Sequence, residues 1–371
     1  MGLMDKIIET IIEHGPITFE RFMDMALYDP ESGYYSSKEK RIGREGDFYT
    51  SSHLHPVFGV IIGKQIYEMW EKIGRPEAFD IVEMGAGEGY VCRDMLEYLK
   101  STAIFKHLNY AIIEINPLVK HRQEKLLSEF SGKVKWFQSL DDVAGVRGCF
   151  FSNELPDAFP VHLLEFQKEL KEVYLKADKG ELTETLGPLS NRAISDYFAS
   201  INIHFDEGYR TEFNLRIREW LNDINKVLKE GFILTIDYGY SDRDYYSEDR
   251  NRGTLMCYHE HQLNENLYEN IGYQDITAHV NFSSVKKWGE DIGIKTTGFT
   301  SQGAFMVSMG IDEEIRKISE NSKDYAMEIA RIKKLIMPQG MGDSHMVMAQ
   351  YKGEGLPQLK GFSIRNQVKY L

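Results

Sequence analysis

The sequence is poor in cysteine, in positive charge and in long apolar runs. Its 3 cysteines, Cys92, Cys149 and Cys257, lie far apart and form no Cys-x-x-Cys pair, so the sequence indicates neither a disulfide framework nor a thiolate zinc site. No stretch reaches the roughly 18 apolar residues of a membrane span, and the N-terminus does not match a secretory signal. Lysine and arginine number 44 against 57 acids, and this net charge of −13 argues against a nucleic-acid partner. We therefore expect a cytoplasmic protein without a membrane span.

The composition that is present is that of an ordinary globular protein, with 371 residues of which 42% are hydrophobic. Short apolar runs alternate with stretches of helical periodicity. Strands separated by helices of this length predict parallel βαβ units with right-handed crossovers, and hence an α/β fold. Strands are predicted at 79–84, 109–114, 134–137, 148–152, 232–236 and near 345–351, with a polar hairpin at 162–186. Helices are predicted at 4–14, 18–27, 57–73, 90–100, 117–130, 211–229, 284–292 and 312–336.

These elements divide the chain into a nucleotide-binding core and the segments around it. The predicted parts are a helical N-terminal extension and lid at 1–45, a Rossmann-like core at 46–165, an insertion at 166–210, a core helix and strand at 211–239, an insertion or substrate lobe at 240–340, and a closing strand and tail at 341–371.

The strongest motif is a glycine turn between the first core strand and the helix that follows it. Gly85, Gly87 and Gly89 have the spacing G-x-G-x-G, which differs from the dinucleotide fingerprint G-x-G-x-x-G, and no phosphate-binding lysine accompanies them. Because glycine has no Cβ, this turn lets the backbone approach a nucleotide-like ligand closely. Glu83, at the end of the strand, can accept hydrogen bonds from an ammonium group.

Two further positions follow the next strands. Glu114 lies about 25 residues after Gly89, where an acid binds ribose hydroxyls in such folds. Leu140 lies in the segment 138–141 after the third strand, which is either a contact to adenine or a solvated loop. A glycine turn with a second acid and no phosphate-binding features favours S-adenosyl-L-methionine over NAD. The alternative is that the turn only joins a strand to a helix, as it does in many α/β proteins.

The segment after the fourth strand carries the candidate acceptor groups. Asn153, Glu154 and Asp157 offer amide and carboxylate oxygens at the carboxyl end of a strand, where open α/β sheets bind their substrates. Two acids close together bind a guanidinium well, since a carboxylate pairs bidentately with its planar fork.

Several motifs in order carry a resemblance to a known family. The chain resembles the MidA-like family of class I S-adenosyl-L-methionine-dependent methyltransferases from about Ile17 to Tyr351. That family has a Rossmann-like class I methyltransferase sheet with a helical N-terminal extension and inserted substrate-side segments. The motifs are 46–51 (Gly-Asp-Phe-Tyr-Thr-Ser), 83–89, 153–162, 237–239 (Asp-Tyr-Gly), 252–255 (Arg-Gly-Thr-Leu) and 275–282.

The resemblance implies roles for residues that spacing alone does not assign. Gly46, Asp47 and Thr50 would form the lid over the methyl donor, and His261 corresponds to the family histidine after the Gly-Thr-Leu segment. The family includes the mitochondrial assembly factor that dimethylates an arginine of a respiratory complex I subunit. It therefore implies a protein substrate with an exposed arginine, a respiratory complex I-type subunit being one candidate, and leaves the oligomeric state open. The chain departs from the family pattern at 52–55 and at His279 and Asn281.

Two other functions stay open at this point. One is methylation of a small molecule with the same donor site, because the fold does not fix the acceptor. The other is a non-catalytic assembly factor that retains the pocket. No metal is expected, because the histidines show no H-E-x-x-H or comparable ligand spacing.

Overall fold

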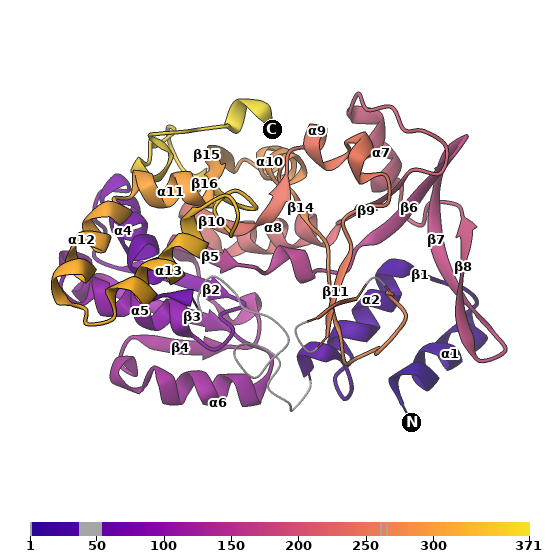
Figure 1. Ribbon diagram of the computed structural model, residues 1–371, viewed down its shortest axis with the longest axis horizontal. Coiled ribbons are helices and arrows are strands. Elements are labelled where there is room, and N and C mark those ends of the chain that lie inside the picture. Colours follow the sequence, from indigo (N-terminus) through magenta and orange to yellow (C-terminus); the bar gives the residue numbers. More distant parts are fainter. Residues whose placement is uncertain (1, 37–53, 260–261, 265) are drawn as a thin grey trace. The chain divides into compact units, whose positions relative to one another are not determined.

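The computed structural model describes residues 2–36, 54–259, 262–264 and 266–371 (Figure 1). The chain forms two compact units, each assembled from separate stretches of sequence. The antiparallel unit consists of Met1–Phe48, Pro156–Glu219 and Tyr240–Asn281. The parallel-sheet unit consists of Tyr49–Leu155, Trp220–Gly239 and Phe282–Leu371.

The parallel-sheet unit is built on one large sheet with the strand order β15-β16-β10-β5-β2-β3-β4. The pairs from β10 to β4 are parallel, whereas β16 is antiparallel to both β10 and β15. The strands are β2 (Phe79–Met84), β3 (Leu108–Ile113), β4 (Val134–Phe137), β5 (Val146–Asn153), β10 (Leu228–Tyr240), β15 (Lys295–Ser301) and β16 (His345–Lys352). The predicted apolar runs therefore form strands, and the α/β fold is confirmed.

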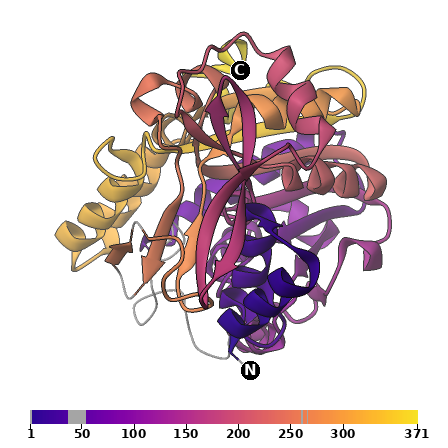
Figure 2. The ribbon, with the colours of Figure 1, turned by 90° about the vertical axis from the view of Figure 1, so that its right-hand side faces the viewer.

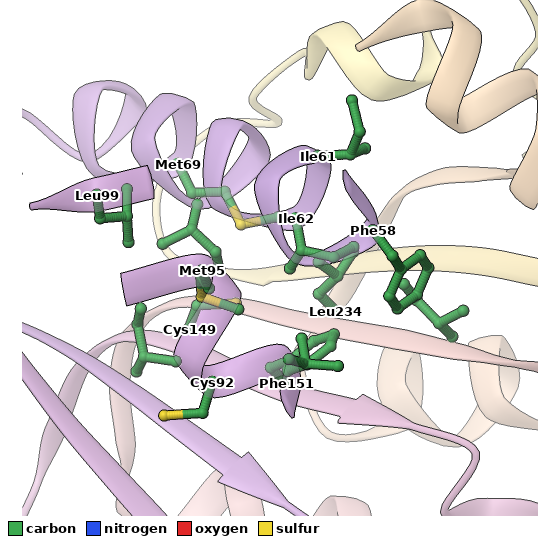
Figure 3. Close-up of a cluster of buried hydrophobic side chains, with 14 of the residues drawn as sticks. Phe58, Ile61, Ile62, Met69, Cys92, Met95, Leu99, Cys149, Phe151 and Leu234 are labelled. Atoms are coloured by element: carbon green, nitrogen blue, oxygen red, sulfur yellow. The ribbon is translucent and has the colours of Figure 1, made fainter. Parts of the chain in front are cut away.

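Helices α4 (Val57–Lys72) and α5 (Tyr90–Leu99) cover one face of this sheet. The predicted apolar stripe of α4, which includes Ile62 and Met69, packs with Met95 of α5 against Phe151 and Leu234 of the sheet (Figure 3). All five side chains are at most 1% exposed, so this cluster is the hydrophobic core that fixes the strands in register. The other helices with residues in this unit are α6 (Pro117–Leu126), α8 (Arg216–Val227), α10 (Phe282–Asp291), α11 (Gln302–Ser308), α12 (Ile311–Asn321) and α13 (Tyr325–Ile336).

The antiparallel unit contains two smaller sheets and the N-terminal helices. One sheet has the order β1-β7-β6-β9 with β8 paired to β7, and the other has the order β12-β11-β13. Figure 2 shows the strands β6 to β8 beside α1 and α2. The elements are α1 (Leu3–His14), β1 (Ile17–Thr18), α2 (Phe19–Tyr28), β6 (His162–Gln167), β7 (Glu169–Asp178), β8 (Glu181–Gly187), α7 (Arg192–Ser200), β9 (Arg210–Phe213), α9 (Asp242–Tyr245), β11 (Met256–His259), β12 (Gln262–Asn264), β13 (Asp275–Thr277) and β14 (Val280–Asn281).

The N-terminal helices are held by a cluster of residues that are distant in sequence. Thr18 begins α2 as predicted, since its side-chain oxygen accepts a hydrogen bond from the Arg21 amide at 3.1 Å. Ile7 of α1 and Phe22 of α2 pack with Val173 of β7 and Ile276 of β13. The apolar face of the N-terminal helices is therefore covered by strands of the same unit.

Three predicted elements differ from the structure. The predicted helix at 312–336 is two helices, α12 and α13, with residues 322–324 between them. The predicted helix at 211–229 begins only at Arg216, because residues 210–213 form strand β9 against β6. There Glu212 is 1% exposed and accepts hydrogen bonds from the Thr254 amide at 2.9 Å, a long-range contact that overrides local helical periodicity. The predicted polar hairpin at 162–186 is a three-stranded meander of β6, β7 and β8. Among the described residues no helix combines the length and the apolar character that crossing a membrane requires.

Candidate methyl-donor and acceptor site

The carboxyl ends of three parallel strands meet at one edge of the large sheet. Met84 at the end of β2 pairs with Ile113 of β3 on one side and with Ser152 of β5 on the other. Adjacent strands lie about 4.8 Å apart. The register therefore brings the glycine turn, Glu114 and Asn153 to the same edge, as the sequence predicts.

The glycine turn adopts the backbone conformation for which glycine is suited. Gly85, Gly87 and Gly89 have φ angles of 72°, 53° and 85°, in the left-handed region, and Gly89 is the N-cap of α5. A Cβ on Gly85 would lie 2.9 Å from Leu155 Cδ1, whereas a Cβ on Gly87 would meet no atom of the described residues within 4 Å. Within that part of the chain the turn is thus packed on one side and open on the other, as the binding of a nucleotide-like ligand requires.

Glu83 lies buried before this turn, with 2% of its surface exposed. The Tyr110 hydroxyl donates a hydrogen bond to Glu83 Oε2 at 2.7 Å. Burial nevertheless dominates, and it raises the pKa of Glu83 to about 7. An arriving ammonium group would favour the ionised form of this carboxyl. The sequence did not reveal Tyr110 as the partner of Glu83. The two residues lie on neighbouring strands, and which residues of two strands meet depends on the register of the sheet.

Glu114 follows β3 and is fixed by two hydrogen bonds. The Asn116 amide donates to Oε1 at 2.8 Å, and Gln123 Nε2 donates to Oε2 at 3.2 Å. Gln123 Nε2 also lies 2.7 Å from the Gly87 carbonyl oxygen, and Trp136 donates to Gln123 Oε1 at 2.9 Å. Burial raises the pKa of Glu114. Gln123 therefore links the acid to the glycine turn, a role that no local sequence signal indicates.

Leu140 is 8% exposed in the short helix Leu140–Asp142 after β4, so it too follows the carboxyl end of a strand of this sheet. On the turn itself, the Arg122 guanidinium pairs with both carboxylate oxygens of Glu88 at 2.9–3.1 Å. This bidentate pair holds Glu88 of the turn against α6.

The acceptor segment begins with a strained residue. Glu154 has a φ of 51°, a conformation that costs a non-glycine residue about 1 kcal/mol. Its amide donates to the Ile236 carbonyl at 2.8 Å, and Asn153 Nδ2 donates to Glu154 Oε1 at 3.2 Å. Asn153 Oδ1 is buried and has no hydrogen-bond partner within the described ranges. A buried acceptor without a partner indicates a place where a ligand donor binds.

The third predicted acceptor residue, Asp157, belongs to the antiparallel unit and is 5% exposed in the short helix Pro156–Ala158. The Ala278 amide donates to its carbonyl at 2.9 Å, and Asn214 donates to the Pro156 carbonyl at 3.1 Å. The remaining predicted site residues, Gly46, Asp47, Thr50 and His261, lie outside the described residues.

Two residues that depart from the family pattern make internal contacts in the antiparallel unit. The His279 ring stacks on Tyr240 with ring centres 5.3 Å apart, and Asn281 donates to Asp242 at 2.7 Å. In the part of the chain that the structure describes, no group of three or more histidine, cysteine, aspartate or glutamate side chains is arranged to hold a metal ion.

Comparison with known proteins identifies S-adenosyl-L-methionine-dependent methyl transfer, the reaction expected from the sequence. Residues 61–300 match a family model described as "Putative S-adenosyl-L-methionine-dependent methyltransferase". Three similar curated proteins are each named a protein arginine methyltransferase NDUFAF7 or its homologue. The Xenopus tropicalis (frog) protein is 27% identical, and the match covers 88% of this chain and 80% of the frog protein. The human protein is 27% identical, with 92% of this chain and 80% of the human protein covered. The Drosophila melanogaster protein is 25% identical, with 95% of this chain and 85% of the fly protein covered.

A solved structure shares nearly the whole fold. It is the crystal structure of a superfamily member from Burkholderia thailandensis bound to S-adenosyl-homocysteine, with a TM-score of 0.91 and 28% identity over 100% of this chain and 96% of that chain. The resemblance, the fold and the methyl donor expected from the sequence are therefore confirmed.

The expected cytoplasmic location is wrong on this comparison. The frog, fruit-fly, nematode and human relatives are all mitochondrial by name. The few cysteines from which that location was inferred indicate only a compartment that keeps thiols reduced, which does not distinguish one such compartment from another.

Proposed function

The chain belongs to this family and is an S-adenosyl-L-methionine-dependent methyltransferase, and from that premise we propose that it methylates an arginine side chain of a protein. The family alone does not set the acceptor, since one fold hosts many substrates. The observation that carries the proposal is the pair Asn153 and Glu154 at the carboxyl edge. Their side chains present a carboxylate and a buried amide oxygen that has no hydrogen-bond partner among the described residues. Such oxygens accept hydrogen bonds from a nitrogen-rich cation, which a guanidinium is.

The donor side of the proposal uses the residues before the acceptor segment. The open face at Gly87 provides room for the donor, with Glu83 near its ammonium group and Glu114 at its ribose hydroxyls. Leu140 would lie at its adenine, and Gly46, Asp47 and Thr50 would cover it. When bound, S-adenosyl-L-methionine supplies an electrophilic methyl group on a sulfonium.

On the acceptor side, this chain orients the attacking nitrogen and excludes water. Asn153 and Glu154 receive the guanidinium N–H groups, and the fixed backbone of Glu154 keeps its carboxylate in place. Asp157 as a second carboxylate for the acceptor, and His261 as a substrate-binding residue, stay predictions from the sequence. A respiratory complex I-type subunit is the substrate candidate that the family resemblance supplies.

The test is transfer of tritiated methyl groups to a lysate from cells that lack this chain. We expect the wild-type protein to label a protein band, with the label located on arginine by mass spectrometry. Glu154→Gln should lose labelling while keeping donor affinity within about threefold by calorimetry, because the acceptor pocket and not the donor pocket is changed. Glu230→Gln is the matched control, since Glu230 lies on β10 near the opposite edge and should leave both readings unchanged.

Other outcomes would contradict the proposal. Label on a small molecule would favour the small-molecule methyltransferase, and no label with normal donor binding would favour the non-catalytic assembly factor. Equal loss of donor binding in Glu154→Gln would show that Glu154 belongs to the donor pocket.

A further inference from the structure

We infer that His345 is a positioning residue for Glu154 that holds the proton released when the acceptor nitrogen is methylated. This inference rests on the proposed function. Neither the glycine motif nor the acceptor motif contains His345, which lies almost 200 residues further along the chain than Glu154.

The topology of the sheet brings the two residues together. Strand β16 runs antiparallel to β10, and His345, its first residue, pairs with Tyr238 near the end of β10. The start of β16 therefore lies at the same edge as the carboxyl end of β5, which leads into Glu154. His345 Nε2 lies 3.7 Å from Glu154 Oε1, and both side chains are more than nine-tenths buried.

The surroundings of the imidazole define which nitrogen carries the hydrogen. His345 Nδ1 lies 3.0 Å from Ser344 Oγ, and the Ser344 hydroxyl donates to the Gly340 carbonyl at 3.4 Å. Because the hydroxyl hydrogen is used there, Ser344 Oγ acts as the acceptor and Nδ1 carries the hydrogen. Nε2 then has a lone pair, and within the described residues it has no hydrogen-bond partner.

Two acceptors thus face each other across the gap between Nε2 and the Glu154 carboxylate. Without a proton between them they do not hydrogen-bond, which fits their separation of 3.7 Å. One proton added between them would convert the pair into an imidazolium and a carboxylate, and a movement of less than about 1 Å would give a charge-assisted hydrogen bond.

Methyl transfer supplies that proton. The bond between the acceptor nitrogen and the methyl carbon forms as the bond between that carbon and sulfur breaks, and the electron pair of the broken bond stays on sulfur. The nitrogen releases one proton, which Glu154 accepts and passes to His345 Nε2. Glu154 is thereby restored as a carboxylate that holds the methylated guanidinium, and the imidazolium later loses its proton to solvent.

The first experiment compares His345→Gln and His345→Ala with wild type in the labelling assay with tritiated donor. A glutamine amide can hydrogen-bond to Glu154 but cannot hold a proton. We therefore expect both variants to lose labelling rate by about 100-fold or more, with donor affinity within about threefold. His107→Gln is the matched control, because His107 directly precedes β3 at the opposite edge and should label as wild type does.

A labelling rate within about tenfold of wild type in His345→Gln would overturn the inference and leave the proposed function intact. If wild type labels no protein, the proposed function fails and the inference fails with it. A second measurement needs no acceptor: ¹⁵N NMR of the histidine rings in the full chain, with His345→Gln to assign the signal. We expect the Nδ1–H tautomer for His345, and the Nε2–H tautomer would overturn the inference.

Discussion

Replacing Glu83 by glutamine should stabilise the protein at alkaline pH. In the wild type this carboxyl is buried, and its pKa rises from 4.5 to about 7. A carboxyl whose pKa is higher in the folded chain than in the unfolded chain stabilises the fold fully only at a pH below its pKa in the unfolded chain. That contribution is lost as the pH rises from about 4.5 through about 7, because the unfolded chain then releases a proton that the folded chain retains. Glutamine keeps an oxygen for the Tyr110 hydroxyl and does not ionise.

The size of the effect follows from the shift. The rise of the Glu83 pKa from 4.5 to about 7, at about 1.4 kcal/mol for each step of one in pKa, corresponds to about 3–4 kcal/mol. We expect Glu83→Gln to exceed wild type by about 3–4 kcal/mol in free energy of unfolding at about pH 8, and the difference to be close to zero at about pH 4.

Urea titrations followed by tryptophan fluorescence measure this difference in the relevant part of the molecule. All 4 tryptophans, Trp70, Trp136, Trp220 and Trp288, lie in the parallel-sheet unit with Glu83. Glu77→Gln, at an exposed position before β2, is the control and should show no pH-dependent difference beyond about 0.5 kcal/mol. A difference between Glu83→Gln and wild type that is the same at both pH values would refute the reasoning.

Three further predictions concern the donor site and the antiparallel unit. Donor affinity measured by calorimetry should fall in wild type as the pH drops below about 7, because only the ionised Glu83 pairs with an ammonium. The affinity of Glu83→Gln should not change with pH over this range. The same pH dependence of affinity in both proteins would exclude that pairing. Gly87→Ala should cost about 1 kcal/mol of stability in urea titrations, because alanine is strained at a φ of 53° while its Cβ meets no described atom within 4 Å. Gly85→Ala also brings a Cβ to 2.9 Å from Leu155 and should cost more. The reverse order would contradict the turn geometry. Glu212→Gln should destabilise the antiparallel unit by about 1–3 kcal/mol, because it replaces an acceptor of the Thr254 amide. Hydrogen exchange of the amides in β9 and β11 measures this loss of stability. Unchanged protection of those amides would argue against the role of Glu212.

The parts of the site that the sequence predicts are local in the chain. The strand at 79–84, the turn glycines and the acid after the next strand occupy one βαβ unit, where apolar runs and turn residues determine both the elements and their order. The positive φ angles at Gly85 and Gly87 follow from the same spacing.

The parts that the sequence does not predict depend on pairing between distant segments. Gln123 reaches the turn only because α6 packs beside it, and His345 reaches the acceptor edge only because β16 returns antiparallel to β10. Strand β9 forms where the periodicity favours a helix, because Glu212 satisfies amides that lie about 40 residues away. A single sequence contains no local signal for any of these three contacts.

The N-terminal helices can bury their apolar face only after much of the chain has been synthesised. Leu3 and Ile7 are translated well before Val173 and Ile276, the side chains that cover them. Until then an amphipathic hairpin of helices has its apolar face uncovered, which is the kind of surface that chaperones bind and that aggregates in crowded cells. A nascent chain stalled before residue 276 should therefore be a chaperone client, even though its methyl-donor turn has already been translated.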